Sequence, residues 1–581
     1  MKKLLRFMRP HRWLLMGAIL CVVINNFTVL YLPNIVSQVI DDGALSGDAG
    51  QIYRLGLRML LVAVVGGIAY LLSVTLASKA ISRFARDVRR AAFVKVQDYS
   101  LDDMQKFGTS SLVIRCTNDI AVIQRSALMV ILQMLPAPIM AIVGIAMGIQ
   151  TEPMMGLLMA VIIAAVFLIA YGIGSRAVPL FRRLQVKMDN MTRILREVFT
   201  GVRVIRAFNR QQYENRRFGT AATEYWDISV RTGKVFAILL PTLTLLTNLG
   251  IVVILWFGGV ETSRGTMEIG QIFALIEYLA VILFTGIMAI LVYIELPRAS
   301  SCAQRINEVL EYTPEIQDRA SAALPAANLR AHLEFRHVTF RYPGAEEAVL
   351  SDLSFTSKAG ETTAIIGGTG SGKSTVANLI PRFFEIQEGE ILIDGINIQD
   401  YAQKQLRDKI GFVPQRAFLF RGTIADNIRY GKEDATDGEV EYAATVAQAH
   451  AFISEKPEQY QSFVAQGGTN LSGGQRQRVA IARALVRKPE IYVFDDSFSA
   501  LDFKTDAMLR AALRKEVKDA TVVIVAQRVS TIMDADRIIV LDNGRAVGVG
   551  THQELMKNCP VYQQIAASQL SESEFAGGGE S

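Results

Sequence analysis

A glycine-rich segment near the middle of the chain carries the residue types that bind a nucleoside triphosphate. It comprises Gly367, Gly368, Thr369, Gly370, Ser371, Gly372, Lys373, Ser374 and Thr375, after an apolar strand and before a helical pattern. Glycines let backbone N–H groups turn toward phosphate oxygens, and the helix N-terminus adds its positive end. The Lys373 amine neutralises the β- and γ-phosphates, and the Ser374 hydroxyl can ligate Mg²⁺. The full spacing favours this interpretation over a structural turn.

Three residues elsewhere could complete such a site. Asp495 ends the apolar strand 491–495, where a P-loop fold places the carboxylate that holds Mg²⁺. Gln415 follows the strand 410–413 and offers an amide to the metal or to the attacking water; an ordinary surface glutamine is the alternative. Tyr342 lies 25 residues before Gly367 and could stack on adenine, although an isolated Tyr-Pro pair is more often a turn.

A second motif decides between nucleotide-binding families. Leu471, Ser472, Gly473, Gly474 and Gln475 open a helix expected to run to Arg487, and Asp502 follows further on. The glycine-rich segment (the P-loop), Gln415, the motif 471–475 (the signature) and the two aspartates follow one another along the chain in the order typical of one family. The chain resembles an exporter-type ABC transporter subunit, with the membrane domain before the nucleotide-binding domain. This resemblance extends from Arg12 to about Gln569.

The resemblance implies a dimer of nucleotide-binding domains. ATP with Mg²⁺ would lie between one P-loop and the signature of the other chain, whose helix N-terminus faces the γ-phosphate. The segments 108–119 and 201–208 resemble those around the two coupling helices, which touch the nucleotide-binding domains in that family. ATP-driven closure would then bias the membrane halves between inward-open and outward-open states.

Three residues depart from the family pattern, and two of them, Asp496 and Gln527, stand at the γ-phosphate. Asp496 stands where the family has a catalytic glutamate, Gln527 where it has a histidine, and Gln466 where exporters often have glutamate before the signature. The aspartate oxygens fall roughly 1.5 Å short, and misplacement near 1 Å can cost about 10²-fold in rate. Glutamine cannot carry the histidine's positive charge. We therefore expect ATP binding with impaired hydrolysis, as in the degenerate-site subunit of a heterodimeric exporter. A homodimeric exporter or nucleotide-gated regulator with slow sites is the alternative.

Composition indicates that much of the chain lies in a membrane. Of the 581 residues, 51 % are hydrophobic and 20 % charged, against about 25 % charged in soluble domains. This excludes a disordered, collagenous or purely soluble chain. The net charge of +6 suits cytoplasmic loops beside anionic lipid as well as nucleic acid. The four cysteines are far apart and argue against a disulfide framework or a zinc site.

Six apolar segments precede the nucleotide motifs, and each reaches the roughly 20 residues that cross a bilayer. Their limits are 13–32, 55–78, 129–150, 155–175, 235–258 and 270–296. Basic residues crowd two long connections, 79–95 and 182–217, which predicts cytoplasmic termini and connections by the positive-inside rule. Within these connections, Ala80–Gln97 and Leu180–Phe208 have helical periodicity and are expected to extend membrane helices into the cytosol.

The expected architecture is an all-α six-helix membrane domain followed by an α/β P-loop ATPase domain. The predicted limits are 1–312 for the membrane domain, 313–331 for a linker, 332–567 for the nucleotide-binding domain and 568–581 for a disordered tail. The absence of an extension before the first span predicts that no peptidase domain is attached. We expect a multi-pass protein of a bacterial plasma membrane, with an organellar membrane as the alternative. The spans disfavour a soluble ABC-type ATPase that acts on nucleic acid, and the fused membrane domain disfavours the energy subunit of an importer.

The spans leave the transported substrate open. Aromatic residues and methionines suit an amphipathic drug, lipid or peptide but equally suit packing or contact with lipid; they are Phe27, Tyr31, Met140, Met147, Phe273 and Met288. Polar residues inside the spans include Asn25 and Asn26 in the first span and Glu277 in the sixth. Burying a carboxylate in lipid is costly, so Glu277 should face a cavity or a partner helix. It would contact substrate or a proton there, or form an interhelical hydrogen bond.

Overall fold

The computed structural model describes residues 3–318 and 330–569, which form two compact units. One unit contains the described residues up to Asp98 together with Phe107–Thr313. The other contains Tyr99–Lys106 and the described residues from Pro314 onward. The predicted limit of 312 assigned Tyr99–Lys106 to the membrane domain, whereas this segment packs with the nucleotide-binding unit: the buried Asp103 carboxylate accepts hydrogen bonds from the Ser100 and Glu315 backbone N–H groups at 3.0 and 3.3 Å.

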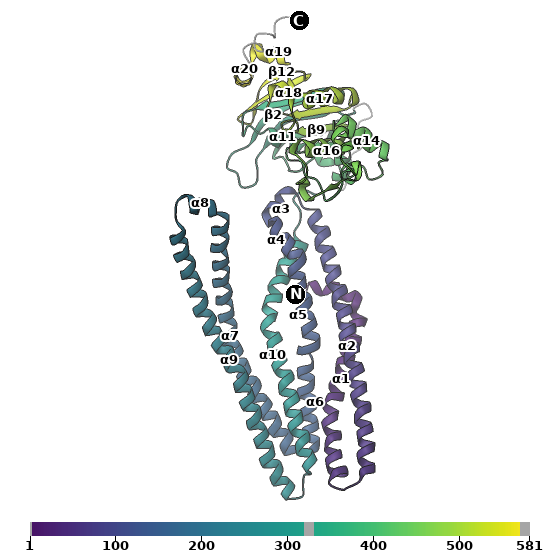
Figure 1. Cartoon of the computed structure of the whole chain (residues 1–581), viewed down its shortest axis with the longest axis vertical. Helices are drawn as coiled ribbons and strands as arrows, with labels where there is room; N and C mark the ends of the chain where they lie inside the picture. The colour runs from purple at the N-terminus through teal and green to yellow at the C-terminus, as the bar shows by residue number, and fades with distance from the viewer. Residues whose placement is uncertain (1–2, 319–329, 570–581) are drawn as a thin grey trace. The chain divides into compact units, whose positions relative to one another are not determined.

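The first unit is a bundle of long helices (Figure 1). Its elements are η1 (Leu4–His11), α1 (Arg12–Gln38), η2 (Val39–Ala44), α2 (Ala49–Gln97), α4 (Thr109–Ile114), η3 (Arg115–Asp119), α5 (Ile120–Met129), η4 (Val130–Met134), α6 (Pro136–Thr151), α7 (Pro153–Thr200), α8 (Val202–Ala207), α9 (Gln211–Ser263) and α10 (Ile269–Glu311). All six predicted spans lie within these helical elements. Within residues 3–318 and 330–569, five helical stretches are long and apolar enough to cross a membrane, and the remaining span starts α7, whose described apolar part is Pro153–Ile169.

Two helices continue well past their apolar segments, as the periodicity predicts. α2 runs without interruption to Gln97. The helical pattern of 180–208 is instead broken, because α7 ends at Thr200 and Gly201 separates it from α8. α7 and α9 contact each other along their lengths and form an antiparallel pair (Figure 1). Val204 and Phe208, at this turn, are 60 % and 74 % exposed in the single chain.

The membrane unit buries a core of aliphatic residues, methionines and one tyrosine. Leu30, Met140 and Tyr278 are members of this core, so Met140 packs inside the chain. Phe27, Tyr31 and Phe273 are exposed on the single chain. Asn26 is buried, whereas Glu277 is exposed and therefore free to meet a cavity or a partner helix outside this chain.

The second unit is an α/β domain built around a six-stranded sheet in the order β12-β11-β3-β10-β9-β6. Its strands are β3 (Thr362–Gly367), β6 (Ile410–Val413), β9 (Ile491–Asp495), β10 (Thr521–Val525), β11 (Arg537–Asp542) and β12 (Arg545–Gly550). All but β12 run parallel, so their carboxyl ends share one edge. In open α/β sheets that edge binds ligands.

A four-stranded antiparallel sheet and several helices complete this unit. The sheet has the order β2-β1-β4-β5 and consists of β1 (Leu333–Phe340), β2 (Leu350–Ser357), β4 (Glu388–Ile393) and β5 (Ile396–Asn397). β7 (Gly422–Thr423) pairs with β8 (Phe463–Val464). The helices are α3 (Leu101–Phe107, which straddles the two units), α11 (Lys373–Leu379), η5 (Ile398–Asp400), α12 (Gln403–Asp408), α13 (Ile424–Arg429), α14 (Asp437–Val446), α15 (His450–Ser454), η6 (Gln459–Gln461), η7 (Gln466–Gly468), α16 (Gly473–Leu485), α17 (Phe503–Glu516), α18 (Val529–Ile532), α19 (His552–Asn558) and α20 (Pro560–Ala567).

Three differences from the predicted boundaries are small. The signature helix ends at Leu485 rather than at Arg487. Pro314–Asp318, expected in the linker, clusters with the nucleotide-binding unit, and Ile316 is buried there. Of the tail expected to be disordered, Ser568 and Gln569 are described and the rest lies outside the described residues, as does most of the linker.

The loop that follows β6 is held by one buried asparagine. The Asn427 amide donates to the carbonyl oxygens of Phe420 and Thr423 at 2.8 and 3.0 Å. Its Oδ1 accepts from Phe420 N at 2.8 Å and from the Arg483 guanidinium at 2.9 Å. Because Arg483 belongs to α16, the asparagine connects this loop to the signature helix.

We predict that Asn427→Ala destabilises the nucleotide-binding unit by about 3 kcal/mol, because several buried polar groups lose their partners. The unfolding midpoint of the purified chain should fall by roughly 5–10 °C. Asn558→Ala is the control, since Asn558 is exposed at the end of α19. Equal midpoints for the two variants would contradict this role of Asn427.

Candidate functional site

The glycine-rich segment forms the turn between β3, which ends at Gly367, and α11, which begins at Lys373. Gly370 and Gly372 have φ angles of +83° and +96°, which favour glycine. A Cβ on Gly372 would lie 2.7 Å from Leu350 Cδ2, whereas one on Gly368 or Gly370 would meet nothing within 4 Å. The turn is thus packed on one side and open on the other.

The residues of this turn fit a triphosphate. The Ser371 Oγ is buried and lacks a hydrogen-bond partner among the described residues. The Lys373 amine donates to the carbonyl oxygens of Gly367 and Gly368 at 2.8 and 2.6 Å, which places its charge over the turn. Together with Gly368, Thr369 and Thr375, these groups surround the N-terminus of α11, where an anion is favoured.

Ser374 and Asp495 are adjacent, as their predicted shared role requires. The Ser374 hydroxyl donates to Asp495 Oδ1 at 2.8 Å. Burial raises the pKa of Asp495 and the charge of Asp496 adds to this, while Ser374 and Lys373 act in the opposite direction. Burial lowers the pKa of Lys373, against the charges of Asp496 and Asp495. A divalent cation brought with the nucleotide would relieve the repulsion between the two carboxylates, so this donor set fits Mg²⁺.

Asp496 is the centre of a second cluster. Its Oδ2 accepts hydrogen bonds from the side-chain amides of Gln527 and Gln415, at 2.8 and 3.1 Å. The side chain is only 7 % exposed. Gln415 follows β6 and Gln527 follows β10, so the shared sheet edge brings together three residues that are far apart in sequence.

Tyr342 lies beside the phosphate turn. Its hydroxyl is 3.1 Å from Thr375 Oγ1 in α11. The ring packs edge-on against Phe340 and Phe384, with centroids 4.9 and 5.2 Å away. The residue remains partly exposed to solvent. Stacking on adenine stays a prediction.

The signature residues form the N-terminus of α16. Ser472 Oγ accepts from Gln475 N at 3.2 Å, and the Gln475 side chain accepts from Ser472 N at 3.0 Å, which is a capping box. Leu471 is buried, whereas Ser472 and Gly473 are exposed and Gly474 is partly exposed. In residues 330–569, no hydrogen bond or ion pair joins Ser472–Gln475 to the phosphate turn, so the signature is open to another molecule.

Two further residues predicted to belong to the site are Asp502 and Gln466. Asp502 caps α17 by accepting from the Thr505 N–H and hydroxyl at 2.9 and 2.8 Å, and these bonds lower its pKa. Gln466 is exposed in η7, before the signature.

Sequence reasoning missed one residue that connects the signature helix to the glutamine loop. Gln477 in α16 is 2 % exposed, and its amide donates to the Pro414 carbonyl oxygen at 3.3 Å. Pro414 directly precedes Gln415, so this hydrogen bond connects α16 to the segment that contacts Asp496. In the sequence, Gln477 stands among polar residues of the helix, so nothing there indicated that it is buried.

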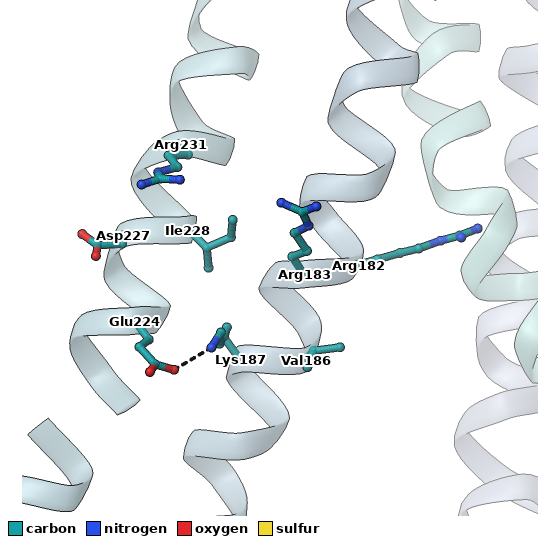
Figure 2. Close-up of a pocket in the computed structure, with 8 residues that line it drawn as sticks. All are labelled: Arg182, Arg183, Val186, Lys187, Glu224, Asp227, Ile228 and Arg231. Atoms are coloured by element: carbon teal, nitrogen blue, oxygen red, sulfur yellow. Dashed lines mark hydrogen bonds and ion pairs between the residues drawn. The ribbon is translucent and has the colours of Figure 1, made fainter. Parts of the chain in front are cut away.

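The membrane unit carries a separate cationic cleft of about 500 Å³ between α7 and α9 (Figure 2). It is lined by Arg182, Arg183, Val186, Lys187, Glu224, Asp227, Ile228 and Arg231. Figure 2 shows Arg183 and Ile228 directed into the space between the helices. Lys187 pairs with Glu224 at 2.6 Å. Among the described residues, the three arginine side chains have no ion-pair or hydrogen-bond partner, so the cleft has excess positive charge.

Comparison with known proteins agrees with both units. The family profile "ABC transporter transmembrane region" matches residues 15–287, and the profile "ABC transporter" matches residues 350–499. An uncharacterized ABC transporter ATP-binding protein of Mycobacterium tuberculosis (strain CDC 1551 / Oshkosh) is 41 % identical over 98 % of each chain. An ATP-dependent lipid A-core flippase of Syntrophus aciditrophicus is 30 % identical, over 99 % of this chain and 95 % of the flippase.

Structural similarity covers the same extent. The solved structure of a bacterial Atm1-family ABC exporter with ATP bound has a TM-score of 0.80 and 28 % identity, over 97 % of this chain and 99 % of that one. A helical membrane domain fused to an ATP-binding domain, matched along nearly its whole length by ABC exporters, establishes that this chain is a multi-pass membrane protein of the ABC transporter family, with the architecture of an ATP-hydrolysing exporter.

Proposed function

We propose that this chain is one subunit of a heterodimeric ATP-driven exporter. It binds ATP and Mg²⁺ in a degenerate site of its own, and its signature completes the hydrolytic site of the partner subunit. The carrying observation is the Asp496 cluster, in which two of the three departures from the family pattern, Asp496 and Gln527, are hydrogen-bonded to each other.

The geometry of Asp496 supports weak hydrolysis at this chain's P-loop. Two amide donors occupy the acceptor positions of Oδ2, which leaves Oδ1 to meet a water molecule. The side chain is one methylene shorter than the family's glutamate, and its buried position limits how far it can reach. The Gln527 amide cannot supply the positive charge of a histidine at the γ-phosphate. The turn around Lys373, Ser374 and Asp495 retains the groups that hold nucleotide and metal.

The signature side of the chain supports the dimer. Ser472 and Gly473 present an exposed helix N-terminus, which is suited to a γ-phosphate held by another chain. Val204, within α8, and Phe208, which directly follows it, offer exposed apolar side chains that suit contact with a nucleotide-binding domain. An intact signature next to an altered P-loop site is what one half of an asymmetric pair needs. A homodimer with two slow sites, acting as an exporter or a nucleotide-gated regulator, is the second candidate, and a partner bearing the missing glutamate decides against it.

The charge distribution supports an orientation with the nucleotide-binding unit and both termini in the cytoplasm of a bacterial cell. It also supports an amphipathic substrate. Arg183 lies eight residues beyond the predicted span 155–175, and Arg231 lies four residues before the span 235–258. At 1.5 Å per helical residue, these side chains start roughly 6–12 Å from the hydrocarbon, near the depth of lipid headgroups. The unpaired guanidiniums suit the acidic group of such a substrate.

The first test is restoration of the hydrolytic site. Asp496→Glu combined with Gln527→His should raise the ATP turnover of the complex, by about an order of magnitude in this chain's own site, because the carboxylate then reaches the water. Steady-state hydrolysis in lipid measures this, with Lys373→Ala added to the restored chain as the control that removes the gain. Unchanged hydrolysis and transport would refute the degenerate site.

The second test separates the two types of dimer. In a complex with its partner, Ser472→Arg should abolish most ATP hydrolysis, because the bulky cation blocks the helix N-terminus that the partner's ATP requires. Lys373→Ala should reduce turnover by less than about threefold, since its loss affects the slow site. Thr469→Ala, at an exposed position close to the signature, is the control. If the chain hydrolyses ATP rapidly without a partner, and Ser472→Arg and Lys373→Ala reduce that hydrolysis equally, the chain is a homodimeric pump.

The third test concerns the cleft. Arg183→Gln with Arg231→Gln should weaken stimulation of the ATPase by phosphatidylglycerol in zwitterionic nanodiscs, shifting the half-maximal concentration roughly tenfold. Arg83→Gln with Arg90→Gln removes the same charge from exposed positions on α2 and serves as the matched control. If both pairs shift the response equally, the effect is general surface charge and the cleft is not a binding site.

A further inference from the structure

The C-terminal end of the described chain contacts the segment that carries Gln527. Gln569 Nε2 donates to the Gln527 carbonyl oxygen at 2.8 Å. Gln569 Oε1 accepts from the Val529 backbone N–H, also at 2.8 Å. One amide thus bridges the two backbone positions on either side of Arg528. Both contacts are to backbone atoms and therefore do not depend on which side chain stands at position 527.

The Val529 N–H needs an external partner. Val529 opens α18, a helix of four residues whose preceding residue, Arg528, gives no side-chain cap. The first N–H groups of a helix have no partner within it, and an unpaired one is costly. Gln569 supplies the missing acceptor from another element. The Arg528 guanidinium donates to the Ser499 carbonyl oxygen at 3.3 Å, which holds the segment from a different direction.

The packing of α20 fixes where Gln569 lies. It follows α20, whose Tyr562 and Ala566 are fully buried in the same core as Val529 and Ile532. The Tyr562 hydroxyl lies 2.7 Å from His552 Nδ1, which connects α20 to α19. Gln569 is exposed, so its two hydrogen bonds can open to water without disturbing this core.

The geometry points to Gln569 as a positioning residue for the γ-phosphate side of the ATP site. By bridging Gln527 and Val529 it sets where the Gln527 side chain lies, and through the 2.8 Å bond from Gln527 Nε2 it sets the Asp496 carboxylate. Opening of this bridge lets the segment after β10 drift and disengages the amide from Asp496. The end of the ATP-binding domain thereby controls the chemistry at its centre. This inference rests on the proposed role of residue 527 at the γ-phosphate.

The test uses the full chain with its partner, in the background Asp496→Glu with Gln527→His, where turnover at this P-loop is visible. Gln569→Ala should lower kcat roughly three- to tenfold with the KM for ATP within twofold, because nucleotide binding residues are untouched and positioning is lost. Gln569→Glu, which retains the acceptor for Val529 N–H but not the donor, should fall between. Gln563→Ala is the matched control, since its side-chain amide donates to the Met556 carbonyl oxygen at 2.7 Å, between α20 and α19 and away from residues 527–529.

Two readouts separate positioning from general loosening. In a chain that carries Gln527→Ala, the change Gln569→Ala should not lower kcat further. A general folding defect would lower kcat in that chain as well. Hydrogen exchange of residues 526–529 should speed up in Gln569→Ala and not in Gln563→Ala, in the natural sequence as well. Unchanged exchange, or a kcat loss that persists with alanine at 527, overturns the inference. If the natural chain hydrolyses ATP rapidly alone, the degenerate site is refuted, and the same cycle run in that chain still tests Gln569.

Discussion

Five parallel strands end at one edge of a sheet, and the phosphate chemistry of this chain depends on that constraint. The turn after β3 carries Lys373, β9 ends in Asp495, and the residues two positions beyond β6 and β10 are Gln415 and Gln527. No local sequence pattern brings these four residues together. Their proximity follows from parallel pairing, because all carboxyl ends of parallel neighbours point the same way. The helices and the second sheet then support this edge.

Two residues of the signature helix α16 hydrogen-bond to segments that follow β6 at the edge of the sheet. Gln477 binds the carbonyl oxygen of Pro414, and Arg483 binds the backbone and side chain of Asn427. Both contacts are buried or partly buried, where a hydrogen bond costs most to break. A displacement of α16 therefore moves the glutamine loop, and with it the donors around Asp496. In the proposed dimer, these contacts form a physical route from ATP bound at the signature to Asp496.

Much of this could be predicted from sequence because its signals are local. The P-loop spacing, the terminal acid of β9 and the capping box at Ser472 each lie within a few residues, and the apolar spans are set by length. The break at Gly201 was missed because apolar periodicity continues across it. Tyr99–Lys106 was assigned to the wrong unit because its partners, such as Glu315, lie about 200 residues away in sequence. Gln477 and Gln569 look like ordinary surface glutamines, and only tertiary structure distinguishes them.

The cluster at Asp496 has a consequence for how such a site should behave. Because two amide hydrogen bonds occupy Oδ2 of Asp496, only Oδ1 is left to order a water molecule. A glutamate at position 496 would have to extend past both amides. The change Gln527→His would remove one of the two amide donors. The two departures therefore support each other: the shorter acid is held by the neutral amide, and restoring either alone leaves a polar group poorly paired. We predict that the single changes Asp496→Glu and Gln527→His recover far less hydrolysis than the pair. Comparing the four combinations by ATPase measurement tests this coupling, and simple additivity would contradict it.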